Sequence, residues 1–214
     1  MSHGVTLNAG YAFTKLMEAT SFLNETDPMP YRGLSASHRP HRVTFNAVWE
    51  LPVGRRRAWF KHMARPLEAM FGNWQLSAIV IRQAGAPLVW GNVIFAADPD
   101  QIALPKGERD VDRWFNTAGF NILSKQTLSS NIRKFPMRLA SVQADGQSKW
   151  DIGLAKGFRI GERAKFLMRA QCFNLMNHPN FGGPNVSPTS AAFGQVTATA
   201  GLSRNIQAAA TLTF

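Results

Sequence analysis

The sequence predicts an all-β fold of antiparallel strands, and three observations lead to this prediction. Apolar residues recur at every second position in six separate stretches. Each stretch runs for about 9–11 residues, the length that a tilted strand needs to cross a bilayer. The connections between the stretches are long and irregular at one end and mostly short at the other. Because side chains alternate between the two faces of a strand, each stretch would have one apolar and one mainly polar face.

The six expected strands follow one another through the whole chain. Five of them alternate cleanly, whereas the third also carries Ile79 and Ile81 on its more polar face. In the fourth, Lys156 falls on the apolar face. A lysine costs about 2–4 kcal/mol at the middle of a bilayer but only about 0–1 kcal/mol near the interface. We therefore expect Lys156 near a rim. The expected strands are 5–14, 41–51, 74–83, 149–160, 165–174 and 206–214.

The link between the fourth and fifth strands fixes their register. If residues 161–163 form a three-residue loop, Ile160 lies opposite Ala164 and Phe158 lies opposite Phe166, so that apolar faces meet. A two-residue loop would set apolar residues against polar ones. Gly161 also suits the positive φ that such a loop requires.

The other connections predict which end of the sheet carries large loops. Segments 17–40, 85–147 and 175–203 are long and would all lie at one end. Segment 52–73 is the exception at the other end, and its apolar residues near helical spacing predict either a basic amphipathic helix at a membrane surface or a plain packed helix. Long loops at one end and shorter turns at the other are typical of outer-membrane barrels.

Composition narrows the class of protein. The 214 residues carry 24 Lys and Arg against 13 Asp and Glu, a formal net charge of +11, which favours nucleic acid, phospholipid or lipopolysaccharide as partners unless the charge lies on solvated loops. No apolar run approaches the roughly 20 residues of a membrane helix. The single Cys172 excludes an intrachain disulfide. The stretch after Met1 lacks basic and apolar regions, which predicts that it is not an export signal.

Aromatic residues near the expected strand ends favour a membrane location. Trp49 lies near the end of the second strand, and Trp74 begins the third. Trp150 begins the fourth strand and Phe158 lies near its end, while Phe214 ends the sixth. Aromatic rings prefer the bilayer interface and form girdles at both rims of a barrel.

Six stretches, the first of them RPHRVTFNAVWELPVG and the last AFGQVTATAGLSRNIQAAATLTF, share a resemblance to one known family. They resemble the C-terminal part of Oar-like TonB-dependent transporters, large outer-membrane proteins of the carboxypeptidase-regulatory-like family that are frequent in acidobacteria. The resemblance implies a 22-stranded barrel with a plug in its lumen. It also implies an N-terminal signal peptide, a β-sandwich and a TonB-contacting segment, which have no counterpart among these residues. We therefore expect residues 1–214 to be a transmembrane β-barrel fragment of about six C-terminal, up-and-down strands with long extracellular loops. The stretches are RPHRVTFNAVWELPVG, GNWQLSAIVIRQAGAPL, GERDVDRWFNTAGF, KWDIGLAKGFRI, MRAQCFNLMNHPNFGGPN and AFGQVTATAGLSRNIQAAATLTF.

The resemblance and the strand phase together define the expected functional surfaces. One set of residues would face the lumen, where it lines the wall or contacts the plug: Arg42, Glu50, Asp151, Arg169 and Gln171. A second set looks like the C-terminal signal read by the barrel assembly machinery: Ile206, Ala208, Ala210, Leu212 and Phe214.

The expected location is the outer membrane of a Gram-negative cell, with the C-terminus in the periplasm. The expected partners are outer-membrane lipid or lipopolysaccharide, the rest of the barrel and its plug, TonB through the N-terminal part, and the assembly machinery. No nucleic acid is expected as a partner of a barrel.

Two other classes of function stay open on the sequence alone. The first is a basic soluble β-sandwich that binds nucleic acid or polysaccharide, which would purify without detergent and bind DNA with a strong salt dependence. The second is an enzyme, but no nucleophile, phosphate-loop or dinucleotide motif is found. His38 and His41 lack accompanying metal ligands, and Glu108, Asp110 and Asp112 lie among arginines that would pair with them. We expect no catalytic residue, cofactor or metal, and we expect the long loops of an isolated chain to be disordered.

Overall fold

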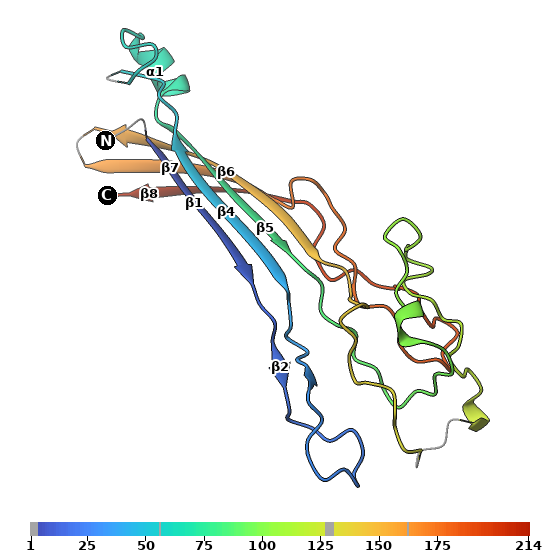
Figure 1. The fold of residues 1–214 in the computed structure, drawn as a ribbon. Coiled ribbons are helices and arrows are strands. Elements are labelled where there is room, and N and C mark those ends of the chain that lie inside the picture. The colour runs from blue at the N-terminus through green and yellow to red at the C-terminus, as the bar shows by residue number, and fades with distance from the viewer. Residues whose placement is uncertain (1–3, 56, 127–130, 162) are drawn as a thin grey trace.

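The computed structural model describes residues 4–55, 57–126, 131–161 and 163–214, and it consists mainly of one antiparallel sheet. The sheet has six strands in the order β1-β4-β5-β6-β7-β8, and a separate two-stranded sheet pairs β2 with β3 (Figure 1). The all-β, up-and-down prediction is confirmed. The strands are β1 (Val5–Phe13), β2 (Met17–Glu18), β3 (Gly33–Leu34), β4 (His41–Glu50), β5 (Trp74–Gln83), β6 (Gln147–Ile160), β7 (Ala164–Phe173) and β8 (Asn205–Thr213).

The register keeps the apolar faces of all six long strands on the same side of the sheet. One continuous row shows this, because Leu7 pairs with Ala47, Ala47 pairs with Ala78, and Ala78 pairs with Ile152. Directly opposite residues of paired strands project to the same face, so alternation within each strand extends across the sheet. The expected strand phase is therefore confirmed in every long strand.

The hairpin between β6 and β7 has the expected register. Ile160 pairs with Ala164 and Phe158 pairs with Phe166. Gly161 has a φ of 64°, the positive value that the three-residue loop requires. Glu162, the central residue of that loop, lies outside the described residues.

The two chain ends lie at the end of the sheet that carries the β6–β7 hairpin and the helix α1 (Arg65–Phe71) (Figure 1). The helix is shorter than the apolar spacing suggests, because Trp59 forms an isolated bridge with Val53 and Met63 precedes the helix. Leu67, Met70 and Phe71 are exposed on it. No helix among the described residues is long and apolar enough to cross a membrane.

Lys156 lies at this end of the sheet, opposite Trp74, the first residue of β5. Its Nζ donates hydrogen bonds to the backbone oxygens of Met70 at 3.0 Å and Gly72 at 2.6 Å, and it lies 4.9 Å from the ring centroid of Trp74. The last turn of α1 contains no basic residue of its own. Lys156 therefore supplies the positive charge that stabilises a helix C-terminus, and the expectation that it lies near a rim is confirmed.

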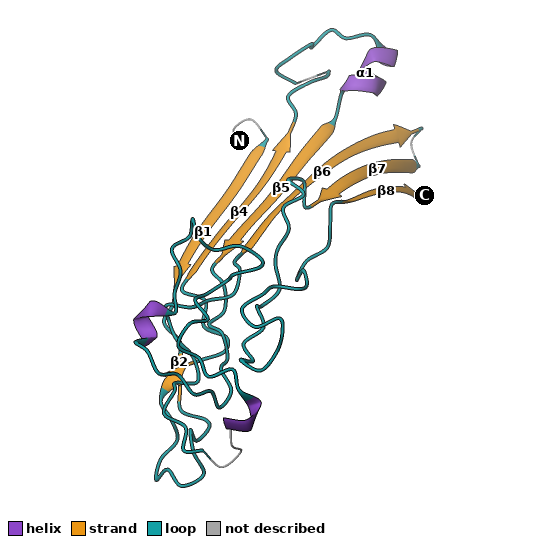
Figure 2. Ribbon diagram, turned by 90° about the vertical axis from the view of Figure 1, so that its right-hand side faces the viewer, coloured by secondary structure: helices purple, strands orange, loops and turns teal. Residues whose placement is uncertain are grey.

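The hydrophobic core lies among the long connections at the opposite end, not in the sheet (Figure 2). Trp90 stacks on Phe120, with ring centroids 5.3 Å apart, and meets Phe115 and Phe135 edge-on. The expectation of disordered loops is therefore wrong for the described residues, because these loops bury enough apolar surface to order themselves. The connection between β5 and β6 also contains two short 3-10 helices, η1 (Pro99–Gln101) and η2 (Ser124–Gln126). The buried core residues are Leu88, Trp90, Val93, Ile102, Trp114, Phe115, Phe120, Phe135 and Val142.

The core joins two of the long connections into one unit, which we call the loop unit (residues 85–146 and 174–204). Phe193 packs edge-on against Phe115, with ring centroids 5.4 Å apart. Backbone hydrogen bonds also cross between the two segments, from Trp114 N to Gly194 O at 2.9 Å and from Val196 N to Val111 O at 2.7 Å. The third long connection contributes through Asn24, whose side chain bonds the backbone of Arg133 in both directions.

The six-stranded sheet is open. Its outer strands, β1 and β8, each pair with only one neighbour, and every described residue of both is exposed. No second sheet packs face to face on it among the described residues, which contradicts the β-sandwich alternative.

Candidate functional site

The larger candidate site is the sheet itself, because its two faces differ in chemistry. The apolar face exposes large side chains on five of the six strands, all except β5, which in water would form a patch far beyond that of an ordinary monomer. On the opposite face of these six strands, Ile79 is the one large apolar side chain that is exposed among the described residues. The exposed residues of the apolar face are Val5, Leu7, Tyr11, Phe13, Val43, Phe45, Trp150, Ile160, Met168, Ile206 and Leu212.

The five residues expected in the lumen all lie on the opposite, polar face. This follows from the register, because each of them alternates with residues of the apolar face. Glu50 forms an ion pair with Arg57 at 3.0 Å, and Asp151 pairs with Lys149 at 3.0 Å. The set is Arg42, Glu50, Asp151, Arg169 and Gln171.

One expected contact on the polar face is wrong. The strand phase suggested that Arg169 and Asp151 lie opposite or one diagonal apart, but Arg169 lies opposite Ala155, four residues from Asp151. The carboxylate of Asp151 instead accepts a hydrogen bond from the Asn174 backbone at 3.0 Å, besides its ion pair with Lys149. The register that the three-residue loop sets already places Arg169 opposite Ala155, so lying on the same face does not bring Arg169 next to Asp151.

The C-terminal strand pairs along its whole length with β7. Ile206 lies opposite Cys172 and Leu212 opposite Phe166, so the alternating residues of the expected assembly signal, with Ala208 and Ala210 between them, continue the apolar face. Phe214 follows the strand and is 91% exposed. The outer edge of β8 is therefore free for another strand.

Aromatic side chains mark both ends of the apolar face. Near the hairpin end lie the rings of Trp74, Phe158 and Phe166. The ring centroids of the two phenylalanines are 6.1 Å apart. Near the loop end, the ring centroids of Phe13 and His41 lie 5.2 Å apart, and Trp150 lies two rows further along the face. This arrangement matches the aromatic girdles of a membrane barrel.

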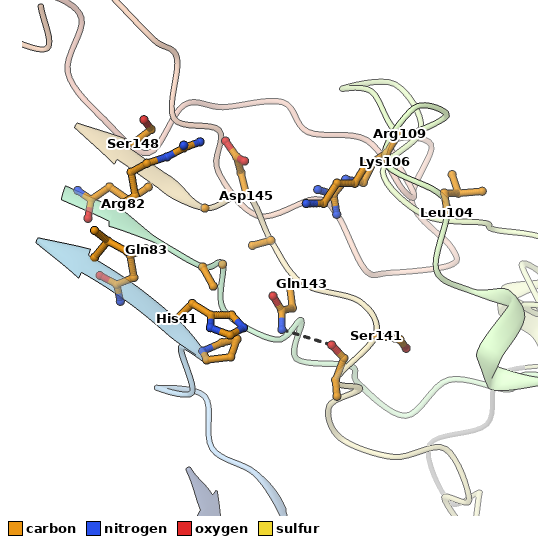
Figure 3. Close-up of a pocket in the computed structure, with 18 of the residues that line it drawn as sticks. His41, Arg82, Gln83, Leu104, Lys106, Arg109, Ser141, Gln143, Asp145 and Ser148 are labelled. Carbon is orange, nitrogen blue, oxygen red and sulfur yellow. Dashed lines mark hydrogen bonds between the residues drawn. The ribbon is translucent and has the colours of Figure 1, made fainter. Parts of the chain in front are cut away.

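A smaller candidate site is a cleft of about 980 Å³ where β4, β5 and β6 meet the loop unit (Figure 3). Arg82 contributes from β5, whereas Lys106 and Arg109 project from the loop unit on the other side. Asp145 is the carboxylate among its described lining residues. The sequence did not predict this site, because Arg82 is distant in the chain from Lys106 and Arg109, and the surplus of positive charge was the sole signal for it.

The comparison with known families decides what kind of protein this is. The profile of a family described as "Outer membrane beta barrel domain" matches residues 1–207. The chain belongs to this family. The barrel domain therefore has its role at the outer membrane, and an antiparallel sheet with one apolar and one polar face is how the wall of such a barrel is built. No curated protein and no solved structure matches the barrel domain.

The candidate metal and acid–base residues of the barrel domain have structural contacts. His38 is buried and its Nδ1 lies 3.2 Å from the backbone N of Leu16, which donates to it, while His41 Nδ1 lies 2.9 Å from the Tyr11 hydroxyl. Asp110 accepts hydrogen bonds from the backbone amides of Asp112 and Arg113. The arginine pairs expected around Asp110 do not form among the described residues. No group of three potential metal ligands occurs in the described part of the chain.

One charged contact connects two long connections of the barrel domain. Arg138 Nη1 donates to Glu18 Oε1 at 2.8 Å and to the backbone oxygen of Leu34 at 2.8 Å. A hydrogen bond from Ser35, together with the nearby charge of Arg138, lowers the pKa of Glu18 below its ordinary value of 4.5. The contact joins the loop unit to the connection that contains β2 and β3, which we call the β2–β3 extension.

This contact predicts that acid loosens the β2–β3 extension. Because the folded-state pKa of Glu18 is lowered, its stabilising effect is present above the unfolded-state pKa and disappears as the pH falls through the lower folded value. A spin label at the exposed Met29 should therefore gain mobility below pH 4.5, and the Glu18→Gln variant should lose most of that acid response. An identical pH response in both proteins would contradict the role of Glu18.

Proposed function

We propose that the barrel domain is the closing part of the wall of a TonB-dependent outer-membrane transporter. The observation that carries this proposal is the open, two-faced sheet, whose first and last strands both offer a free edge. In lipid each unpaired backbone group costs several kcal/mol, and barrels with about eight strands are the smallest common ones. The six strands therefore need further strands to complete a wall.

Further support comes from the polar face and from the resemblance to Oar-like transporters. Arg42, Arg169 and Gln171 have no hydrogen-bond or ion-pair partner among the described residues, so they are free to contact a plug. In this proposal the plug moves when TonB pulls on it, and the wall residues hold the plug in place before that movement. The barrel assembly machinery would recognise β8 through Ile206 to Phe214.

The proposed orientation places the loop unit outside the cell and the C-terminus in the periplasm. The three long connections share one end of the sheet, and the termini, α1 and the β6–β7 hairpin share the other (Figure 1). An even number of strands returns the chain to the side from which it started, so both ends lie on the periplasmic side. The long loops of such barrels are extracellular.

The orientation predicts where cysteines react with a membrane-impermeant maleimide. In a Cys172→Ser background of the full-length protein, Leu202→Cys should label on intact cells, because Leu202 is 86% exposed in the loop unit. Lys61→Cys, at the opposite end of the sheet, is the matched control and should label only after lysis. The reverse pattern would refute the proposed topology.

A further inference from the structure

The basic cleft lies where both faces of the sheet meet the loop unit, and Gln83 and Gln147 line it from the polar face. Its strand cation, Arg82, lines it together with Val43 and Ser148, and these three residues pair with one another in a single row across β4, β5 and β6. That row belongs to the apolar face, because Val43 also pairs with Tyr11. The loop unit provides the other wall of the cleft (Figure 3).

The cleft also lies at a definite height along the sheet. The row of Arg82 is one step beyond the row that contains Phe45 and Trp150, towards the loop unit. On β5 and β6 the apolar band of this face ends at Val80 and Trp150, whereas β4 continues it with Val43. Arg82 is therefore the cation of the apolar face that lies directly above this band, where lipid headgroups meet the outer surface of a barrel.

The cations of the cleft are not neutralised by the protein. Arg82 and Lys106 are exposed and have no hydrogen-bond or ion-pair partner in the described part of the chain. Arg109 lies over the ring of Trp114 at 4.5 Å, a stacking contact that does not occupy its N–H groups. Asp145 accepts a hydrogen bond from the Phe181 backbone at 3.0 Å and forms no ion pair with these cations.

We propose that this cleft binds a phosphate group of the phosphorylated glycolipid in the outer leaflet, namely lipid A of lipopolysaccharide. Three cations and one carboxylate give the cleft a charge of about +2, which matches the −1.5 to −2 of a phosphomonoester at neutral pH. Arginine and lysine side chains donate strong, charge-assisted hydrogen bonds to phosphate oxygens. The acyl chains would then lie along the apolar face beside Phe45 and Trp150. One lipid molecule would therefore fill the cleft with its phosphate and cover the apolar face with its acyl chains.

Binding to the full-length protein, purified in a non-ionic detergent, tests this inference. We expect saturable binding of diphosphorylated lipid A, followed by thermophoresis, and no saturable binding of lipid A from which both phosphates have been removed. Arg82→Gln/Lys106→Gln should weaken binding at least about tenfold, because each change removes a hydrogen bond to a charged group. Lys125→Gln/Lys134→Gln is the matched control: it removes the same charge from exposed loop positions outside the cleft and should bind like the unchanged protein.

Three results would overturn the inference. Equal binding of the dephosphorylated lipid would show that the cleft does not recognise phosphate. An equal loss in the control variant would show a general charge effect and no localised site. Competition by soluble glucose 1-phosphate as effective as that by lipid A would assign the cleft to a soluble phosphorylated ligand instead. The inference rests on the proposed orientation, but binding in detergent does not depend on it, so failure here and failure of the labelling experiment are separate results.

Discussion

Replacing Phe45 by arginine should prevent stable insertion of the protein into a bilayer. Phe45 lies at the middle of β4 on the apolar face, between Ala9 and Val80. An arginine on the lipid face of a barrel costs about 2–4 kcal/mol at the bilayer midplane and about 0–1 kcal/mol near the interface. On β4 the apolar face continues beyond Phe45 with Val43, so Phe45 lies inside the apolar band, where this cost is a large part of the roughly 5–15 kcal/mol that stabilises a typical folded protein. The measurement is the free energy of unfolding of the full-length protein from lipid vesicles in a urea titration.

The neighbouring residue provides the control for this substitution. Asn46 belongs to the same strand but projects to the polar face, between Asn8 and Ile79. Asn46→Arg places the same charge one residue away and should change the free energy of unfolding by less than about 1 kcal/mol. A larger loss for Asn46→Arg than for Phe45→Arg would mean that the two faces are assigned the wrong way round.

Replacing Phe115 by alanine should unfold the loop unit while the sheet stays intact. Phe115 is fully buried and contacts aromatic rings of both joined segments, among them Trp90 and Phe193. Truncation of a buried phenylalanine costs about 3–5 kcal/mol, and Phe115 lies in the core that joins these two segments. Limited proteolysis of the protein in the membrane should therefore cut the loop unit rapidly, while the strands of the six-stranded sheet remain protected.

Ile122→Ala is the control, because Ile122 lies in the same segment but is 61% exposed. It should leave the rate of cleavage close to that of the unchanged protein. Equal protection of the Phe115→Ala and Ile122→Ala variants would contradict the view that the loop unit has a hydrophobic core of its own.

The sequence was sufficient to predict the sheet because strand phase is a local property. The alternation around Phe45, Trp150 and Ile206 sets which side chains share a face, and the three-residue loop after Ile160 sets the register of one strand pair. The position of Lys156 near a rim followed from the cost of burying its charge in lipid. Its hydrogen bonds to Met70 and Gly72 could not be predicted, since they depend on where α1 folds back.

The loop unit and the cleft could not be predicted because they depend on contacts between distant, non-periodic segments. Trp90, Phe115 and Phe193 follow neither a period of two nor a helical period, so the pattern indicated only irregular loops. Arg82 and Lys106 come together only because the loop unit folds over the ends of β4 to β6. The contact between Arg169 and Asp151 was wrong for a different reason: it was predicted from their shared face alone, whereas the register of the hairpin places Arg169 opposite Ala155.

The central claim is that the polar face of this sheet lines the interior of a larger barrel that holds a plug. A photoactivatable cross-linking amino acid at position 169, on the polar face, tests this claim most directly when it is placed in the full-length protein in its own outer membrane. The same amino acid at position 168, on the apolar face, is the control. Mass spectrometry should find cross-links from position 169 to a segment of the same protein outside residues 1–214, and cross-links from position 168 to lipid. Cross-links to lipid from position 169, with protein cross-links from position 168 instead, would contradict the account.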